Sequence, residues 1–69
     1  MNQSNYRLGF PPVLLKVGDK VRVIKSENGA PAKFDQQLGI VENTSGSIGV
    51  RFEGEPLLWR YTKAELIKE

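Results

Sequence analysis

The fold is decided by the stretch VGDKVRVIK, residues 17–25, in which a turn leads directly into alternating side chains. Its Gly-Asp pair is a turn signal placed just before the alternation begins. Successive side chains of a strand point to opposite faces, so Val21 and Val23 would share one face and the basic residues between them the other. We therefore predict a strand over residues 20–25 with its two valines in a core.

Four further short segments have the same character. We predict strands at residues 37–42, 47–52, 57–61 and 66–68. Turn-forming residues separate these segments, and Thr62 with Glu65 matches a capping box, which predicts a 3₁₀ turn before the last strand. Short strands divided by turn signals are typical of a small barrel. The predicted fold class is all-β, a small five-stranded SH3-like barrel with a short 3₁₀ turn before its last strand.

A chain of 69 residues has room for one domain. Residues 13–69 would form the barrel. Residues 1–12 are polar and end in Pro11-Pro12, and two consecutive prolines do not enter a central strand, so we predict a flexible N-terminal arm. The loop over residues 26–35 is long for a hairpin connection, and loops of this kind often carry binding.

The predicted core consists of the larger apolar residues of the strands: Val21, Val23, Leu38, Ile40, Ile48, Val50, Phe52 and Leu66. In the second strand this assignment turns Gly39 and Val41 to the opposite face, and Gly39 would mark a bulge or a tight bend. Trp59 and Tyr61 would either fill the core or serve as aromatic anchors at an interface.

The composition argues against catalysis. The chain has no cysteine and no histidine, which removes thiol chemistry, disulfides and the commonest general base and metal ligand. The eight acidic residues fall mostly at turns and strand ends, where we expect them to be solvated. We therefore expect a non-enzymatic, cytoplasmic domain that binds no cofactor and no metal, does not insert into a membrane and is a monomer in isolation.

The basic residues are the candidate binding groups. Ten lysines and arginines against eight acidic residues give a net charge of +2. Arg22, Arg51 and Arg60 would share one outer wall of the barrel if the strands pair as predicted. Such a wall would attract an acidic partner, although ordinary solvated charges would produce the same pattern. The candidate partner-binding residues are Arg51, Lys20, Arg22, Arg60, Lys25 and Lys63.

Four short stretches resemble the peripheral E subunit of photosystem I. They are residues 18–23, 39–41, 50–52 and 61–66. A similar frame recurs in the variable chain of ferredoxin–thioredoxin reductase and in the S subunit of the NAD(P)H dehydrogenase-like complex. The chain departs from the photosystem subunit in having only a short link, residues 53–56, between its third and fourth strands. It is therefore similar to a relative of that subunit rather than to the subunit itself.

The resemblance implies an SH3-like accessory subunit of a photosynthetic electron-transfer complex. Its partners would be a larger protein complex and an acidic redox protein such as ferredoxin. Arg51 matches a basic position tied to ferredoxin docking, and Lys20 and Arg22 match basic positions of the first strand. The implied location is cytoplasmic, or peripheral on the cytoplasmic or stromal face of the thylakoid membrane.

Two other functions fit the same predicted fold, because fold alone does not fix function. A nucleic-acid-binding module would use the basic residues together with Tyr6, Phe34 or Trp59 as stacking surfaces. A regulatory adaptor for a signalling protein would bind through the Pro11-Pro12 arm or through the loop at residues 26–35.

Overall fold

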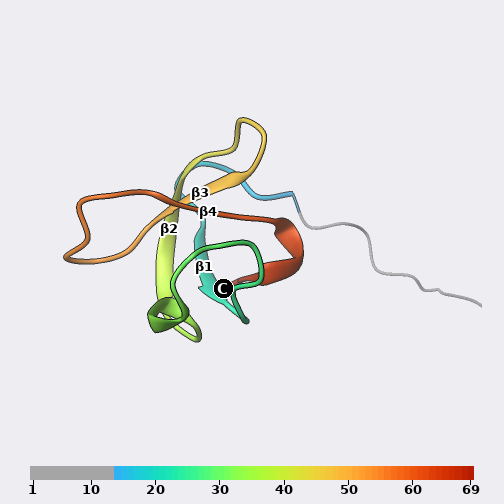
Figure 1. Ribbon diagram of the computed structural model, residues 1–69. Coiled ribbons are helices and arrows are strands. Elements are labelled where there is room, and N and C mark those ends of the chain that lie inside the picture. The colour runs from blue at the N-terminus through green and yellow to red at the C-terminus, as the bar shows by residue number, and fades with distance from the viewer. Residues whose placement is uncertain (1–13) are drawn as a thin grey trace, which may run out of the picture.

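The computed structural model describes residues 14–69 (Figure 1). They form one antiparallel sheet of five strands: β1 Lys20–Val23, β2 Leu38–Asn43, β3 Ile48–Arg51, β4 Trp59–Tyr61 and β5 Leu66–Lys68. Two 3₁₀ turns, η1 Ala32–Phe34 and η2 Lys63–Glu65, accompany them, and this part of the chain has no α-helix. The predicted fold class is confirmed, including the 3₁₀ turn before the last strand. The predicted arm, residues 1–12, lies outside the described residues.

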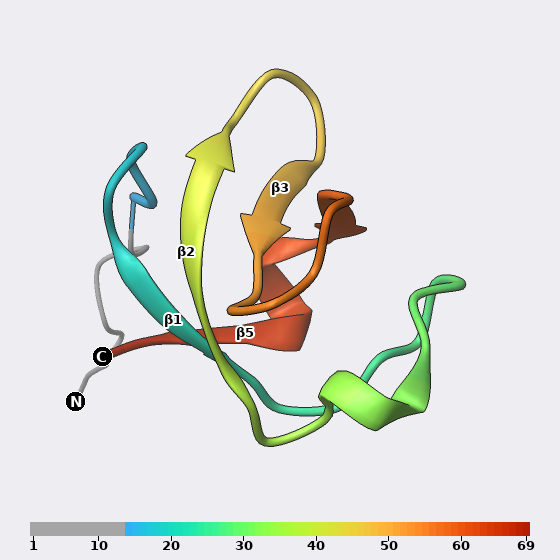
Figure 2. The ribbon, with the colours of Figure 1, turned by 90° about the vertical axis from the view of Figure 1, so that its left-hand side faces the viewer.

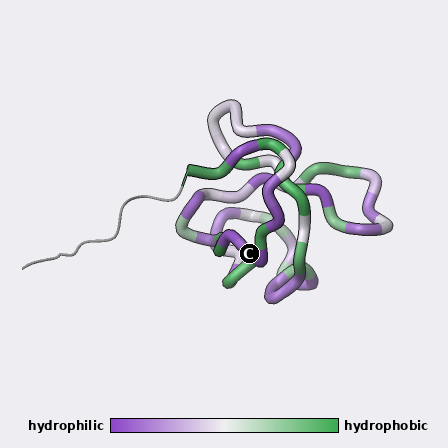
Figure 3. Tube along the Cα trace, turned by 180° about the vertical axis from the view of Figure 1, so that it is seen from behind, coloured by the Kyte–Doolittle hydropathy of each residue, from purple (hydrophilic) through white to green (hydrophobic). Residues whose placement is uncertain are grey.

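The strands are arranged in the order β4-β3-β2-β1-β5, so β1 is an inner strand of the sheet and not an edge strand. β1 pairs with β2 on one side and with β5 on the other, so the first and last strands adjoin. Figure 2 shows β5 running across the foot of β1 and β2, so that the sheet curls around its own inner face. Figure 3 shows hydrophobic and hydrophilic residues interspersed along the whole trace of the described chain. No helix within residues 14–69 is long and apolar enough to cross a membrane.

The core is filled by nine residues drawn from all five strands, from η1 and from the start of the link after β3. They are Val21, Val23, Phe34, Val41, Ile48, Val50, Phe52, Tyr61 and Leu66. The valines of β1 are fully buried, as their alternation predicts. Tyr61 is a core residue, and Trp59 is half-buried and packs against the core.

The predicted faces of β2 are wrong. Leu38 and Ile40 are 43% and 39% exposed, whereas Gly39 and Val41 are buried. Val41 pairs with Val50 of β3, and both point into the core. The two-residue period of β2 therefore holds, but its larger aliphatic side chains lie outside.

Gly39 explains this reversal, because its lack of a side chain lets β3 approach closely. A Cβ atom placed on Gly39 would lie 2.5 Å from Cγ1 of Val50 and 3.0 Å from the carbonyl oxygen of Arg51. A side chain at this inward position has no room. Of the two alternatives predicted for Gly39, a bulge or a tight bend, the bulge is wrong, because the register shift between β2 and β3 lies between Val41 and Asn43.

The loop between β1 and β2 contributes to the core, which the sequence did not predict. Its 3₁₀ turn η1 carries Phe34, which is only 5% exposed. The Phe34 ring stacks on Phe52 with centroids 4.2 Å apart and nearly parallel planes. Stacked aromatic pairs add to the stability gained by burial alone. The loop is therefore anchored to the end of β3 rather than free.

One acidic residue, Glu65, is buried, contrary to the expectation that the acidic residues are solvated. It is 2% exposed and forms the predicted capping box of η2 with Thr62. Its carboxylate also accepts hydrogen bonds from the Glu27 backbone N–H at 2.6 Å and from Nδ2 of Asn28 at 3.3 Å. Glu65 thereby ties the β1–β2 loop to the turn before β5.

The Tyr61 hydroxyl is buried without a hydrogen-bond partner among residues 14–69. Burial, and then the nearby carboxylates of Asp35 and Glu65, raise the pKa of Tyr61 from 10.0 to about 12. As the pH rises, the unfolded chain therefore loses this proton first. The contribution of Tyr61 to stability is complete below pH 10 and is lost as the pH rises towards 12.

We expect Tyr61→Phe to raise the free energy of unfolding by up to about 1 kcal/mol at neutral pH, because it removes a buried hydroxyl that has no hydrogen-bond partner within residues 14–69. The substitution should also remove part of the alkaline loss of stability. Urea unfolding at neutral pH and between pH 10 and 12 measures both effects. A clear loss of stability at neutral pH would contradict the prediction.

Candidate protein-binding surface

The strands bring basic and aliphatic side chains together on the side of the sheet that faces away from the core. We call this surface the outer sheet face and define it by Lys20, Arg22, Leu38, Ile40 and Arg51. Lys20, Ile40 and Arg51 lie side by side across β1, β2 and β3. Arg22 and Leu38 form the next row, and all five residues follow from the alternation of the strands.

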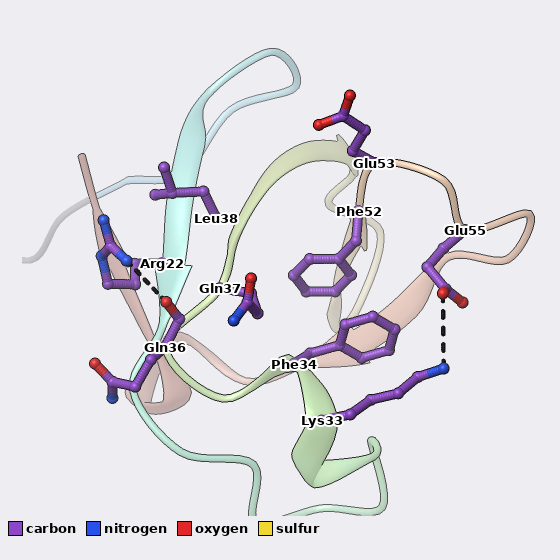
Figure 4. Close-up of a pocket in the computed structure, with 9 residues that line it drawn as sticks. All are labelled: Arg22, Lys33, Phe34, Gln36, Gln37, Leu38, Phe52, Glu53 and Glu55. Atoms are coloured by element: carbon purple, nitrogen blue, oxygen red, sulfur yellow. Dashed lines mark hydrogen bonds and ion pairs between the residues drawn. The ribbon is translucent and has the colours of Figure 1, made fainter.

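A groove of about 420 Å³ runs over this face and is lined by Lys20, Leu38, Gly39, Ile40, Glu42, Arg51 and Glu53. It adjoins a second hollow of about 560 Å³, because Leu38 and Glu53 line both. Figure 4 shows the second hollow between the β1–β2 loop and the segment after β3, with Lys33 and Glu55 reaching towards each other. These two side chains form an ion pair of 3.6 Å. The outer sheet face is thus hollowed rather than flat.

Arg51 lies on this face as predicted, but its guanidinium is engaged within the chain. Nε donates to Oε2 of Glu42 at 3.0 Å. Nη1 donates to the carbonyl oxygens of Glu55 and Pro56, at 3.3 Å and 3.0 Å. Arg51 therefore holds the link between β3 and β4, and Glu42 offsets its charge.

The other two arginines also have local partners. Arg22 donates to the carbonyl oxygen of Gln36 at 2.7 Å and lies 3.4 Å from Oε2 of Glu69. Arg60 donates to Oδ1 of Asn43 at 2.8 Å. Arg22 lies beside Leu38 at the start of β2, whereas Arg60 contacts Asn43 at the end of β2. The three arginines predicted to share one wall therefore do not form a single cluster.

Lys20 is the one basic residue of the outer sheet face whose charge has no partner within residues 14–69. It is exposed and lies beside Ile40. Lys25 and Lys63 are exposed as well, but Lys25 follows β1 and Lys63 belongs to η2. Of the six predicted binding residues, the outer sheet face therefore contains Lys20, Arg22 and Arg51. Arg60, opposite Gly49, points to the same side of the sheet but lies apart from them, beside Asn43.

Leu38 and Ile40 are surface residues that the sequence reasoning assigned to the core. The signal that could have revealed them is Gly39, because a glycine between two large aliphatic residues marks the face where a neighbouring strand approaches closely. With Gly39 inward, both neighbours must point outward.

The proposed stacking surfaces for nucleic acid are weakened by the same structure. Phe34 is buried against Phe52, so its ring has no free face for a base. Trp59 is half-buried, and Tyr6 lies outside the described residues. Residues 14–69 also contain no group of three or more acidic side chains placed to hold a metal ion.

Comparison of the chain with protein-family models, curated proteins and solved structures gave no match.

Proposed function

We propose that this chain is a non-catalytic docking module that binds an acidic protein partner through the outer sheet face. The observation that carries the proposal is the exposed ammonium of Lys20, which has no ionic partner within residues 14–69 and lies on a face that also presents the locally paired Arg22 and Arg51. The burial of Glu65 supports it, because one of the eight carboxylates contributes nothing to the accessible surface. Positive surface charge accelerates encounter with an acidic protein.

The finer form of the proposal is an accessory subunit of a photosynthetic electron-transfer complex that docks ferredoxin. It draws on the four stretches that resemble the peripheral E subunit of photosystem I. It would place the chain at the cytoplasmic or stromal face of the thylakoid membrane. The chain would supply the docking surface, and its partners would carry the redox centres.

The proposal is tested with a plant-type ferredoxin as the probe. We expect Lys20→Glu to weaken binding about fivefold at low salt, mainly by slowing association, and to have less effect as salt rises. Lys63→Glu makes the same change of charge on η2, away from the outer sheet face, and is the matched control. Surface plasmon resonance at several salt concentrations measures both variants.

Equal losses in the two variants would mean that only net charge matters and that the outer sheet face is not the site. Absence of ferredoxin binding by the unmodified chain at low salt would overturn the ferredoxin form of the proposal. Salt-sensitive binding to single-stranded nucleic acid in its place would favour the nucleic-acid alternative.

A further inference from the structure

The exposed aliphatic pair Leu38 and Ile40 on β2 does not contribute to the hydrophobic core. Leu38 and Ile40 point away from the core, and both line the groove on the outer sheet face. Their positions two residues apart put them roughly 7 Å from each other along one strand. Single exposed aliphatic residues are common, whereas adjacent apolar residues rimmed by polar and charged side chains mark interaction sites.

The charges on the two sides of this pair differ. On the β1 side lie Lys20, which has no ionic partner within residues 14–69, and Arg22, which is paired with Glu69. On the β3 side, Arg51 is paired with Glu42, and Glu53 also lines the groove. The excess charge is therefore positive on the β1 side, where it comes from Lys20, and negative on the β3 side, where it comes from Glu53.

We infer that the outer sheet face takes an acidic amphipathic helix, whose apolar stripe packs on Leu38 and Ile40 and whose carboxylates lie on the β1 side. The inference rests on the proposed function and adds the shape and the apolar character of the partner. Recognition of an amphipathic helix by an apolar groove is a recurring mode of peptide binding.

The two parallel lines of side chains favour a helix over an extended segment. The aliphatic line follows β2 and the cationic line follows β1, about 4.8 Å away. An extended strand presents one line of side chains on each face, so it would match one of these lines and not the other. A helix presents adjacent apolar and acidic stripes on one face, because residues three and four apart are neighbours on its surface.

The apolar pair also determines how the interaction depends on salt. Charge attraction to Lys20 and Arg22 is weakened by salt, whereas burial of Leu38 and Ile40 is not. Binding that retains part of its affinity at high salt is therefore expected for a helix with an apolar stripe. A helix with the same charge but no apolar stripe should lose nearly all of its affinity.

The test uses two synthetic helical peptides of equal length and charge as probes. One carries a leucine stripe bordered on one side by glutamates, and the other has alanine at each leucine position, since alanine preserves the helix. We expect the leucine peptide to bind the full chain about tenfold more tightly, which is the gain expected from burying part of two aliphatic side chains. Isothermal titration calorimetry at low and high salt measures the difference.

The variant Leu38→Thr/Ile40→Thr should remove this difference, and threonine retains the strand preference of β2. Leu57→Thr is the matched control, because Leu57 is a highly exposed aliphatic residue in the β3–β4 link outside the groove. Circular dichroism and thermal unfolding establish that both variants are folded. The leucine peptide should keep its advantage with the control and lose it with the double variant.

Equal affinity for the two peptides, or an advantage that survives in the double variant, would overturn the inference. If ferredoxin binding is lost in Lys20→Glu but unchanged in the double variant, the proposed docking function stands and the apolar recognition is wrong. If the unmodified chain binds neither peptide nor ferredoxin, both the function and the inference fail.

Discussion

Gly39→Ala is expected to lower the free energy of unfolding by about 2 kcal/mol, a large fraction of the stability of so small a domain. The added methyl group would meet Cγ1 of Val50 at 2.5 Å, the Arg51 carbonyl oxygen at 3.0 Å and the Phe52 ring at 3.0 Å. Two of these atoms belong to core side chains and the third to the backbone of β3, so none can move away without disturbing the sheet. Urea denaturation at neutral pH measures the loss.

Gly49→Ala on β3 is the matched control for this prediction. Its Cβ would come no closer than 3.2 Å to another atom, the Cβ of Asn43, and its next neighbours are the side-chain ends of Arg60 and Leu58, both at 3.4 Å. The loss of stability should therefore be smaller at Gly49 than at Gly39. Equal losses at both positions would mean that replacing a glycine in a strand, and not the crowding at Gly39, sets the cost.

Combining Gly39→Ala with Val50→Ala tests the cause directly. Removing Cγ1 of Val50 relieves the closest contact, so the double variant should be more stable than the sum of the two single losses predicts, by about 1 kcal/mol. The relief is partial, because the contacts with the Arg51 carbonyl oxygen and the Phe52 ring remain. Strictly additive losses would mean that the contact with Val50 is not what destabilises Gly39→Ala, and that β2 and β3 separate at another point.

The same glycine marks the limit of what the sequence predicts about the sheet. In β1 the apolar residues of the alternation are Val21 and Val23, and both are buried as predicted. In β2 the alternation offers Leu38 and Ile40 on one face and Gly39 and Val41 on the other. Side-chain size favours burial of Leu38 and Ile40, but the two-residue period alone does not determine which face points to the core. The close approach of β3 to Gly39 determines it, and this is a contact between segments that are distant in the sequence.

The remaining differences have similar non-local causes. The composition of residues 26–35 predicts a loop, and most of it is one, but Phe34 is drawn into the core by a ring eighteen positions away in the chain. The outward direction of the basic residues on β1 and β3 follows from alternation. Their partners do not, because Glu42, Gln36 and Glu69 reach them only when the sheet has formed. The sequence thus indicates where the charges lie but not which of them are free.

Glu65 is the second position where a large effect is expected. Its Oε1 accepts hydrogen bonds from the backbone N–H and the hydroxyl of Thr62, at 2.7 Å and 3.1 Å, and from Nδ2 of Asn28 at 3.3 Å. Its Oε2 accepts the 2.6 Å bond from the backbone N–H of Glu27. Burial by itself raises the pKa of Glu65, but these four hydrogen bonds outweigh it and hold the pKa below the ordinary value of 4.5.

We expect Glu65→Gln to lower the free energy of unfolding by about 1.5–3 kcal/mol at neutral pH, the range measured for hydrogen bonds to charged groups. A glutamine amide can offer one oxygen, so its NH₂ group would face either the Glu27 N–H or the Thr62 donors and leave them unsatisfied. The β1–β2 loop should then loosen from η2. Hydrogen exchange at the Glu27 amide measures this local opening, and Glu53→Gln, on an exposed carboxylate, is the control.

The pH dependence of unfolding distinguishes the contribution of the Glu65 charge from that of its side-chain shape. Because the pKa of Glu65 is lowered in the folded chain, the unfolded chain takes up this proton first as the pH falls. The stabilisation is therefore complete above pH 4.5 and is lost as the pH falls through the lower folded value. The stability difference between the unmodified chain and Glu65→Gln should accordingly shrink on acidification. A difference that stays constant with pH would mean that the fit of the side chain, and not its charge, holds the loop to the last turn.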